Sequence, residues 1–120
     1  MVYRDFPLPN HDQATPAAEA AQCAHLQGKF WPYHDKLFEN FRTLSPELYS
    51  SLAKELDLDI AEFEACVSSG VTKESVTEDL EQATRLGVNS TPAFFINGRF
   101  LSGAQPLEAF TAIIDEELGR

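Results

Sequence analysis

The two cysteines, Cys23 and Cys66, carry the most reactive side chains of this chain, and they stand 43 positions apart. A thiol that attacks disulfides needs a lowered pKa, which proteins provide at helix N-termini or in Cys-x-x-Cys motifs. Neither cysteine opens a predicted helix, and neither belongs to such a motif. Both lie on apolar faces of predicted helices, so two interpretations stay open. They are either free buried thiols or a structural disulfide that would stabilise the fold by about 4 kcal/mol.

The other candidates for chemistry give weaker signals. His34 and Asp35 could act in acid–base catalysis, but His34 shares a helical stripe with phenylalanines, which favours a partly buried structural histidine. His11 and His25 lack zinc-ligand spacing relative to the cysteines. The six glycines are scattered and form no phosphate-binding loop. We therefore expect no metal and no bound cofactor, and we assign Trp31 and the nine phenylalanines to the core.

The charge of the chain excludes one class of partner. Nine basic residues face nineteen acidic ones, for a net charge of −10, so we expect no binding to nucleic acid. Nine acids and one base, Lys73, lie between Glu55 and Glu81. That stretch is typical of a solvated helical face, and a docking site for a basic partner is the alternative. The 120 residues allow one domain, and no apolar stretch approaches the roughly 18 residues that span a membrane.

The elements that would position these residues follow from caps and periodicity. Residues 2–6 are expected to form a strand. A helix follows from near Pro16 and breaks near Gly28, and a second helix has Pro32 in its first turn. Ser45-Pro46 predicts the start of a third helix, and Asp59 that of a fourth. A fifth helix begins near residue 72 and ends at residue 87, with its apolar side chains spaced for burial.

A β-hairpin and a last helix complete the prediction. Asn97-Gly98 is a strong turn signal because both positions accept a positive φ, and it joins strands at residues 92–96 and 99–102. The expected buried side of the last helix carries Leu107, Phe110, Ile113, Ile114 and Leu118. The order strand, helices, hairpin, helix indicates an α/β or α+β domain with an inserted helical subdomain.

Three stretches of the chain together carry a family pattern. They are Arg4-Asp5-Phe6-Pro7-Leu8; Cys23-Ala24 with Gln27-Gly28-Lys29-Phe30-Trp31 and His34-Asp35-Lys36-Leu37-Phe38; and Leu86-Gly87-Val88-Asn89-Ser90-Thr91-Pro92-Ala93-Phe94-Phe95-Ile96-Asn97-Gly98 with Gly103-Ala104-Gln105-Pro106. In this order they resemble the DsbA-like branch of the thioredoxin superfamily. The resemblance implies an α/β thioredoxin-like fold over residues 1–120. It places the helical insertion at about residues 14–86 and the hairpin with its helix at about residues 91–118.

The resemblance also implies a site and a biological setting. In that family a cis-proline loop borders the active site and pairs with an extended substrate peptide, which assigns substrate binding to Ser90, Thr91 and Pro92. The implied partners are reduced or misoxidised proteins and a membrane reoxidase, in the periplasm or another extracytoplasmic compartment. Relatives with this pattern often carry both Cys23 and Cys66, and the family works under oxidising conditions, where disulfides persist.

The chain departs from the family pattern at the redox motif. In the family, a strand and a Cys-x-x-Cys helix precede the segment that resembles residues 2–6, and no signal peptide precedes that segment here. We interpret the chain as the C-terminal part of an oxidoreductase that contains no catalytic residue of its own. The alternatives are a non-catalytic peptide-binding module and a same-fold isomerase that uses glutathione. In the family, the strand before the Cys-x-x-Cys helix lies in the middle of the sheet. Without that strand, residues 2–6 would pair with residues 93–96, stay loose, or associate with another chain.

Overall fold

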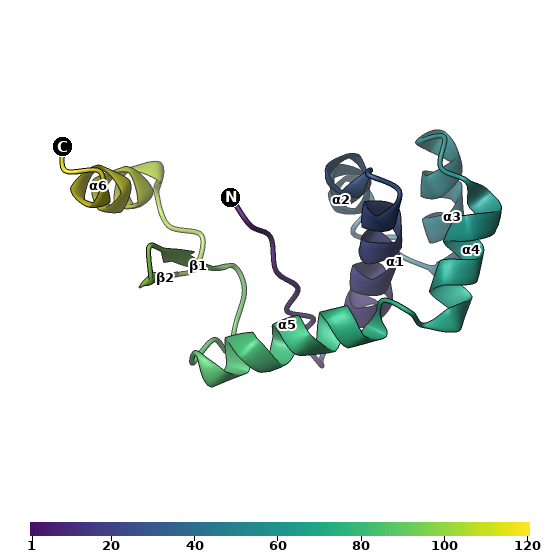
Figure 1. The fold of residues 1–120 in the computed structure, drawn as a ribbon, viewed down its shortest axis with the longest axis horizontal. Coiled ribbons are helices and arrows are strands. Elements are labelled where there is room, and N and C mark those ends of the chain that lie inside the picture. The colour runs from purple at the N-terminus through teal and green to yellow at the C-terminus, as the bar shows by residue number, and fades with distance from the viewer. The chain divides into compact units, whose positions relative to one another are not determined.

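The chain, described over residues 1–120 by a computed structural model, forms two compact units, Met1–Gln82 and Ala83–Arg120. The mixed α/β order of the elements agrees with the sequence-based expectation (Figure 1). The elements are α1 (Ala14–Leu26), α2 (Phe30–Glu39), α3 (Pro46–Glu55), α4 (Ile60–Ser69), α5 (Lys73–Arg85), β1 (Ala93–Ile96), β2 (Arg99–Ser102) and α6 (Leu107–Glu117). All six predicted helices and the predicted hairpin are therefore present.

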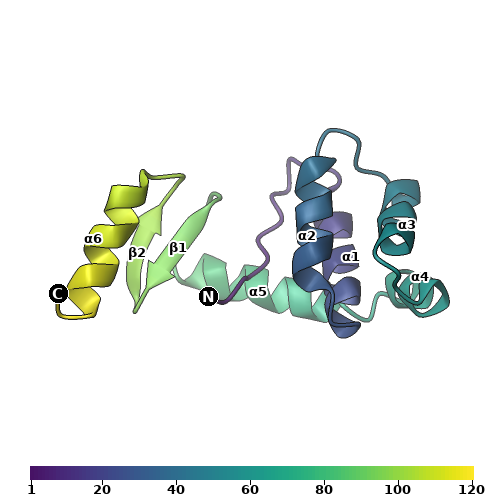
Figure 2. The same ribbon diagram turned by 90° about the horizontal axis from the view of Figure 1, so that it is seen from above.

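The predicted strand at residues 2–6 is wrong. The single sheet consists of β1 and β2, and residues 1–8 have no regular secondary structure. The segment instead runs as an extended coil (Figure 2). The Tyr3 ring packs against Phe30 of α2, with 5.1 Å between the ring centroids. A strand needs a neighbour for its N–H and C=O groups. Here no strand lies beside the segment, and side-chain contacts fix it in place of a ladder.

Local signals set the helix ends. The Ser45 hydroxyl accepts a hydrogen bond from the Leu48 N–H at 3.2 Å, directly before the proline that opens α3. The Asp59 carboxylate accepts one from the Glu62 N–H at 3.0 Å and begins α4. Each cap satisfies a backbone donor that a helix leaves free in its first turn. These caps act within a few residues, which is why the sequence alone predicted both helix starts.

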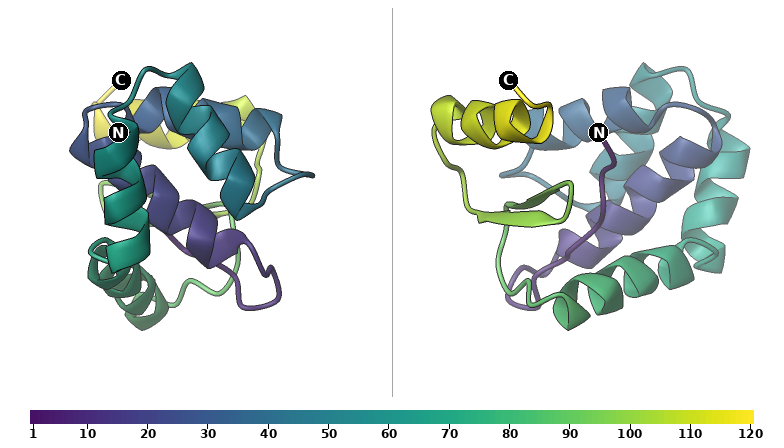
Figure 3. Two further views of the ribbon diagram at one scale, coloured as in Figure 1. Left: turned by 90° about the vertical axis from the view of Figure 1, so that its right-hand side faces the viewer. Right: turned by 60° about the vertical axis from the view of Figure 1, so that its left-hand side comes forward.

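The first unit holds the hydrophobic core. α1 packs on α2, α3 and α4, which stand around it in both views of Figure 3. Tyr33 of α2 is 0% exposed, and its hydroxyl donates to the Tyr49 carbonyl of α3 at 3.0 Å. Its ring also packs on Phe63 of α4, with 5.6 Å between centroids. The buried cluster comprises Ala20, Ala21, Cys23, Ala24, Phe30, Tyr33, Tyr49, Leu52, Ala53, Leu58 and Phe63.

The second unit is a hairpin covered on one face by α6. β1 and β2 are antiparallel, with Phe95 opposite Phe100. Phe94 points to α6 and meets Phe110 edge to face, with 4.8 Å between the ring centroids. Phe95 and Phe100 contact each other on the opposite face, where they are 43% and 49% exposed. One apolar face of this small sheet therefore remains without a covering element of its own unit.

The predicted buried side of the last helix is wrong in part. No residue of α6 is buried, and Leu107 and Leu118 are 75% and 61% exposed. Phe110 keeps its predicted contact with the hairpin. A unit of this size has little interior, because small domains bury a smaller share of their surface. Helical spacing identifies the apolar face, but it does not say how deeply that face is covered.

Candidate functional site

Ser90, Thr91 and Pro92 form an exposed loop directly before β1. α5 ends at Arg85, and Gly87 adopts a φ of +87° that turns the chain out of the helix. The Thr91–Pro92 peptide bond is cis, as predicted. The Pro92 carbonyl accepts a hydrogen bond from the Gly103 N–H at 2.9 Å, which ties the loop to the residue that follows β2 at the open end of the hairpin.

The backbone groups of this loop are available for pairing. Neither Ser90 nor Thr91 makes a backbone hydrogen bond in the structure. β1 has β2 on one side and no strand on the other. An exposed strand edge with free N–H and C=O groups can add an extended peptide through main-chain hydrogen bonds. The three residues predicted for substrate binding thus lie in one exposed loop beside a free strand edge, and their role in binding stays a prediction.

The two cysteines are joined, which decides between the two open interpretations in favour of the disulfide. Cys23 of α1 and Cys66 of α4 form a disulfide with 5.9 Å between their Cα atoms, and the chain has no free cysteine. Cys23 is 1% exposed and lies 3.9 Å from the Thr72 hydroxyl, measured from its sulfur atom. Both cysteines lie in helix interiors rather than at helix N-termini. The pair therefore links two core helices and offers no thiolate nucleophile.

His34 lies in an aromatic cluster formed by α2 and the N-terminal segment. Its ring centroid is 4.7 Å from that of Phe38 and 5.2 Å from those of Tyr3 and Trp31. Its side chain is 21% exposed, and Nδ1 lies 3.1 Å from the Asp35 carboxylate. This environment agrees with the predicted structural histidine. The assignment of every large aromatic residue to the core is wrong, because Trp31 and Phe38 are 43% and 63% exposed.

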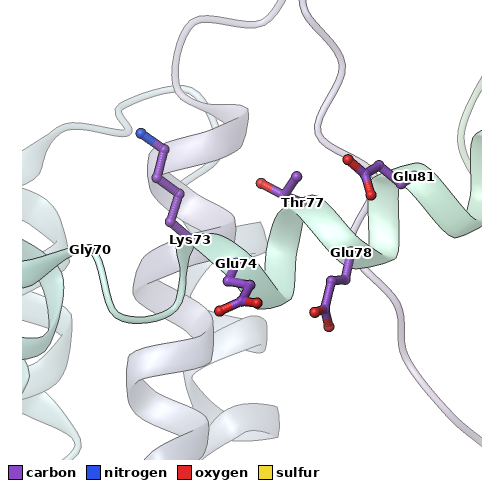
Figure 4. A pocket seen from close by; sticks show the side chains of 6 residues that line it. All are labelled: Gly70, Lys73, Glu74, Thr77, Glu78 and Glu81. Atoms are coloured by element: carbon purple, nitrogen blue, oxygen red, sulfur yellow. The ribbon is translucent and has the colours of Figure 1, made fainter.

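The acidic stretch forms a solvated helical face, with one exception. Glu74, Glu78 and Glu81 line a shallow hollow along the outer side of α5, together with Lys73 and Thr77 (Figure 4). Their carboxylates point to solvent, as the composition predicted. Asp79 of the same helix is only 9% exposed and faces inward.

Asp79 belongs to a polar cluster that sequence reasoning missed. The Asp5 N–H donates to Asp79 Oδ2 at 3.0 Å, and Arg4 binds Asp79 Oδ1 at 3.0 Å. Gln22 of α1 donates to Asp5 Oδ2 at 2.8 Å. The available signal was the position of Asp79, three residues after Val76 on the stripe that α5 buries. An acid on an apolar stripe indicates a buried polar contact.

No group of three or more His, Cys, Asp or Glu side chains is arranged to hold a metal ion. None of the helices combines the length and the apolar character that crossing a bilayer requires.

Comparison with known proteins identifies the family. The family model described as "Thioredoxin" matches residues 1–116. The chain is 37% identical over 108 residues to a protein of Herminiimonas arsenicoxydans named Na(+)/H(+) antiporter NhaA, covering 90% of this chain and 17% of that protein. It is 37% identical over 114 residues to Na(+)/H(+) antiporter NhaA 1 of Salinispora arenicola, covering 94% of this chain and 18% of that protein. The chain thus spans less than a fifth of the length of these relatives. Because the family model covers nearly all of its residues, the chain belongs to the thioredoxin family.

Proposed function

We propose that this chain is part of a DsbA-like protein thiol–disulfide oxidoreductase, which forms, reduces or isomerises disulfide bonds in extracytoplasmic proteins. The observation that supports the proposal is the exposed Ser90–Thr91–Pro92 loop in front of a free strand edge, in a chain of the thioredoxin family. The Cys23–Cys66 disulfide is structural in this proposal. The redox pair is a Cys-x-x-Cys outside these 120 residues.

The loop serves as the peptide-binding part of that enzyme. Free backbone groups at Thr91 pair with the main chain of an extended substrate, which needs no particular side-chain sequence. Ser90 borders this contact, and Pro92 cannot compete for it because it has no N–H. Such a surface suits reduced or misoxidised proteins, whose unfolded segments are extended and varied in sequence. A membrane reoxidase and a periplasmic location complete the proposal.

A titration with a peptide tests the binding role in this chain itself. The ¹⁵N-labelled chain is titrated with an unfolded peptide that contains one alkylated cysteine. We expect the amide signals of Thr91 and Ala93 to shift, because main-chain pairing changes their hydrogen bonding. The matched control is the same peptide with N-methyl groups on the residues flanking the cysteine, which removes its donors. Its affinity should fall by about tenfold, the effect of one or two lost hydrogen bonds. Equal binding of the two peptides, or shifts confined to the first unit, would contradict the proposal.

The relatives named as antiporters support a second candidate function. Proteins named Na(+)/H(+) antiporter NhaA contain a segment similar to 90% or more of this chain. In this candidate the chain is a non-catalytic thioredoxin-like module that binds peptides and is associated with a membrane cation antiporter. The natural reading frame upstream of residue 1 distinguishes the candidates. A Cys-x-x-Cys within about 40 residues, the length of a strand–helix–strand unit, supports the enzyme, and an antiporter sequence without that motif supports the module.

A further inference from the structure

Two carboxyl groups meet beneath the N-terminal segment of the first unit. Asp5 is 5% exposed and Asp79 9% exposed, although they lie 74 positions apart in the sequence. Their link is the bond from the Asp5 N–H to Asp79 Oδ2 at 3.0 Å. The side-chain amide of Gln22 in α1 donates a hydrogen bond to Asp5 Oδ2 at 2.8 Å. Three elements are thus joined through one pair of acids.

We propose that Asp5 and Asp79 form a proton-operated latch, which holds residues 1–5 on α1 and α5 when the two carboxyls share a proton and loosens them when both are ionised. The arrangement favours one shared proton because two carboxylates in contact repel each other. Arg4 binds the Asp79 carboxylate, so Asp5 is the member that gains and loses the proton. A proton on Asp5 lets its hydroxyl donate to Asp79 while Gln22 still donates to Asp5.

The groups around Asp5 agree with this assignment. The pKa of Asp5 is raised to about 6, chiefly by burial and also by the charge of Asp79, although the bond from Gln22 lowers it. On its own segment, Arg4 is engaged with Asp79, and Tyr3 is a neutral phenol whose pKa is raised by burial and by Asp5. α1 presents the neutral amide of Gln22. On α2, the His34 ring contacts Tyr3. The remaining acids of α5, Glu74, Glu78 and Glu81, lie on its outer side.

The sign of the effect follows from the raised pKa. A carboxyl whose pKa is higher in the docked state than in the free segment favours docking at low pH. The contribution of Asp5 to docking is fully present below about pH 4, the ordinary pKa of an aspartate, and it is lost as the pH rises through about 6, the pKa of Asp5 in the docked state. A shift of the pKa from 3.8 to about 6 makes docking about tenfold more favourable at pH 5 than at pH 7.5. The latch therefore closes on acidification.

Hydrogen exchange at the Asp5 amide tests the latch, because this N–H is one of the bonds that close it. Exchange is measured by NMR on the full 120-residue chain at pH 5 and pH 7.5, and each rate is divided by the rate of an unstructured peptide at the same pH. We expect the protection of the Asp5 amide to be about tenfold higher at pH 5. Asp5→Asn replaces the carboxyl with a side chain of similar size that cannot ionise. The protection of the backbone amide at residue 5 should therefore be the same at pH 5 and pH 7.5 in this variant.

Two further measurements make the result decisive. Asp12→Asn removes an exposed aspartate from the following loop and should behave like the unchanged chain. Asp5→Asn retains His34, so a pH dependence that persists in this variant would assign the effect to another group and overturn the latch. Equal protection at both pH values in the unchanged chain would also overturn it. If Asp5→Asn does not fold, as judged by circular dichroism, the ¹³C carboxyl titration of Asp5 in the unchanged chain decides. A midpoint near 6 supports the latch, and one near 4 refutes it.

Discussion

The Tyr33 hydroxyl donates a hydrogen bond to the Tyr49 carbonyl at 3.0 Å, and this buried contact joins α2 to α3. Tyr49 in turn donates its own hydroxyl to the Gln13 side chain at 2.8 Å, next to the start of α1. Three helices of the core are thus connected by two phenols. Each phenol combines a large apolar ring with one polar atom that must find a partner when buried.

Tyr33→Phe should lower the free energy of unfolding by about 1–2 kcal/mol, because it leaves the ring in place and removes one buried hydrogen bond. Urea denaturation followed by circular dichroism measures the change. Tyr3→Phe is a matched control, since it removes the same atom from a half-exposed ring whose hydroxyl makes no hydrogen bond. A loss as large in Tyr3→Phe as in Tyr33→Phe would show that the buried bond is not the cause.

Removal of the disulfide should cost about 4 kcal/mol of stability in the chain-entropy model, because the bond closes a loop of about 43 residues in the unfolded state. The double variant Cys23→Ala/Cys66→Ala should therefore unfold at a much lower urea concentration. Reductant should destabilise the unchanged chain and leave the double variant unaffected, which makes that variant its own control. Unchanged stability of the native chain in reductant would show that the disulfide contributes little.

The chain alone should not oxidise a reduced protein substrate. To be oxidised, a substrate needs one thiolate that attacks an accessible disulfide and a second thiol that resolves the mixed disulfide. The Cys23–Cys66 disulfide lies between two helices of the first unit, and Cys23 is 1% exposed, so a protein thiolate does not reach it. Recovery of activity from a reduced, unfolded enzyme measures turnover. Turnover that is present in the unchanged chain and absent in Cys23→Ala would contradict this expectation.

Self-association should follow from the uncovered sheet face and free strand edges of the second unit. Phe95 and Phe100 expose adjacent rings, and each strand of the hairpin has one unpaired side. We expect the sedimentation coefficient to rise with concentration from the micromolar to the millimolar range. Phe100→Lys should suppress this rise, whereas Val71→Lys, which replaces an exposed apolar residue of the first unit, should not. A strictly monomeric chain at all concentrations would refute the prediction.

The parts of the fold that sequence predicted correctly are those fixed by near neighbours. The caps at Ser45 and Asp59 and the Asn97-Gly98 turn act within three residues, so their elements were found. Residues 2–6 have a strand-like sequence, but a strand exists only if another strand lies beside it, and none does.

The same distinction applies to the site. The cis bond at Thr91–Pro92 and its place directly before β1 were predicted correctly because the motif is contiguous, whereas the substrate-binding role of the loop stays a prediction. The pairing of Cys23 with Cys66 stayed open because helical periodicity gives the inner face of each helix and not which helices meet. The contact between Asp5 and Asp79 spans 74 positions. Periodicity and caps relate residues only a few positions apart, so they could not predict this contact, and it became visible only in the folded structure.

Trp31 is the single tryptophan of the chain, and its ring meets Tyr3 edge to face, with 5.7 Å between the centroids. Indole emission shifts in wavelength when the ring gains or loses contact with water, and Trp31 is already 43% exposed. If Tyr3 leaves, one side of the indole becomes wet while the rest of the helix stays in place. The chain therefore carries its own fluorescent probe for the attachment of the N-terminal segment, readable at nanomolar concentration and without any added label.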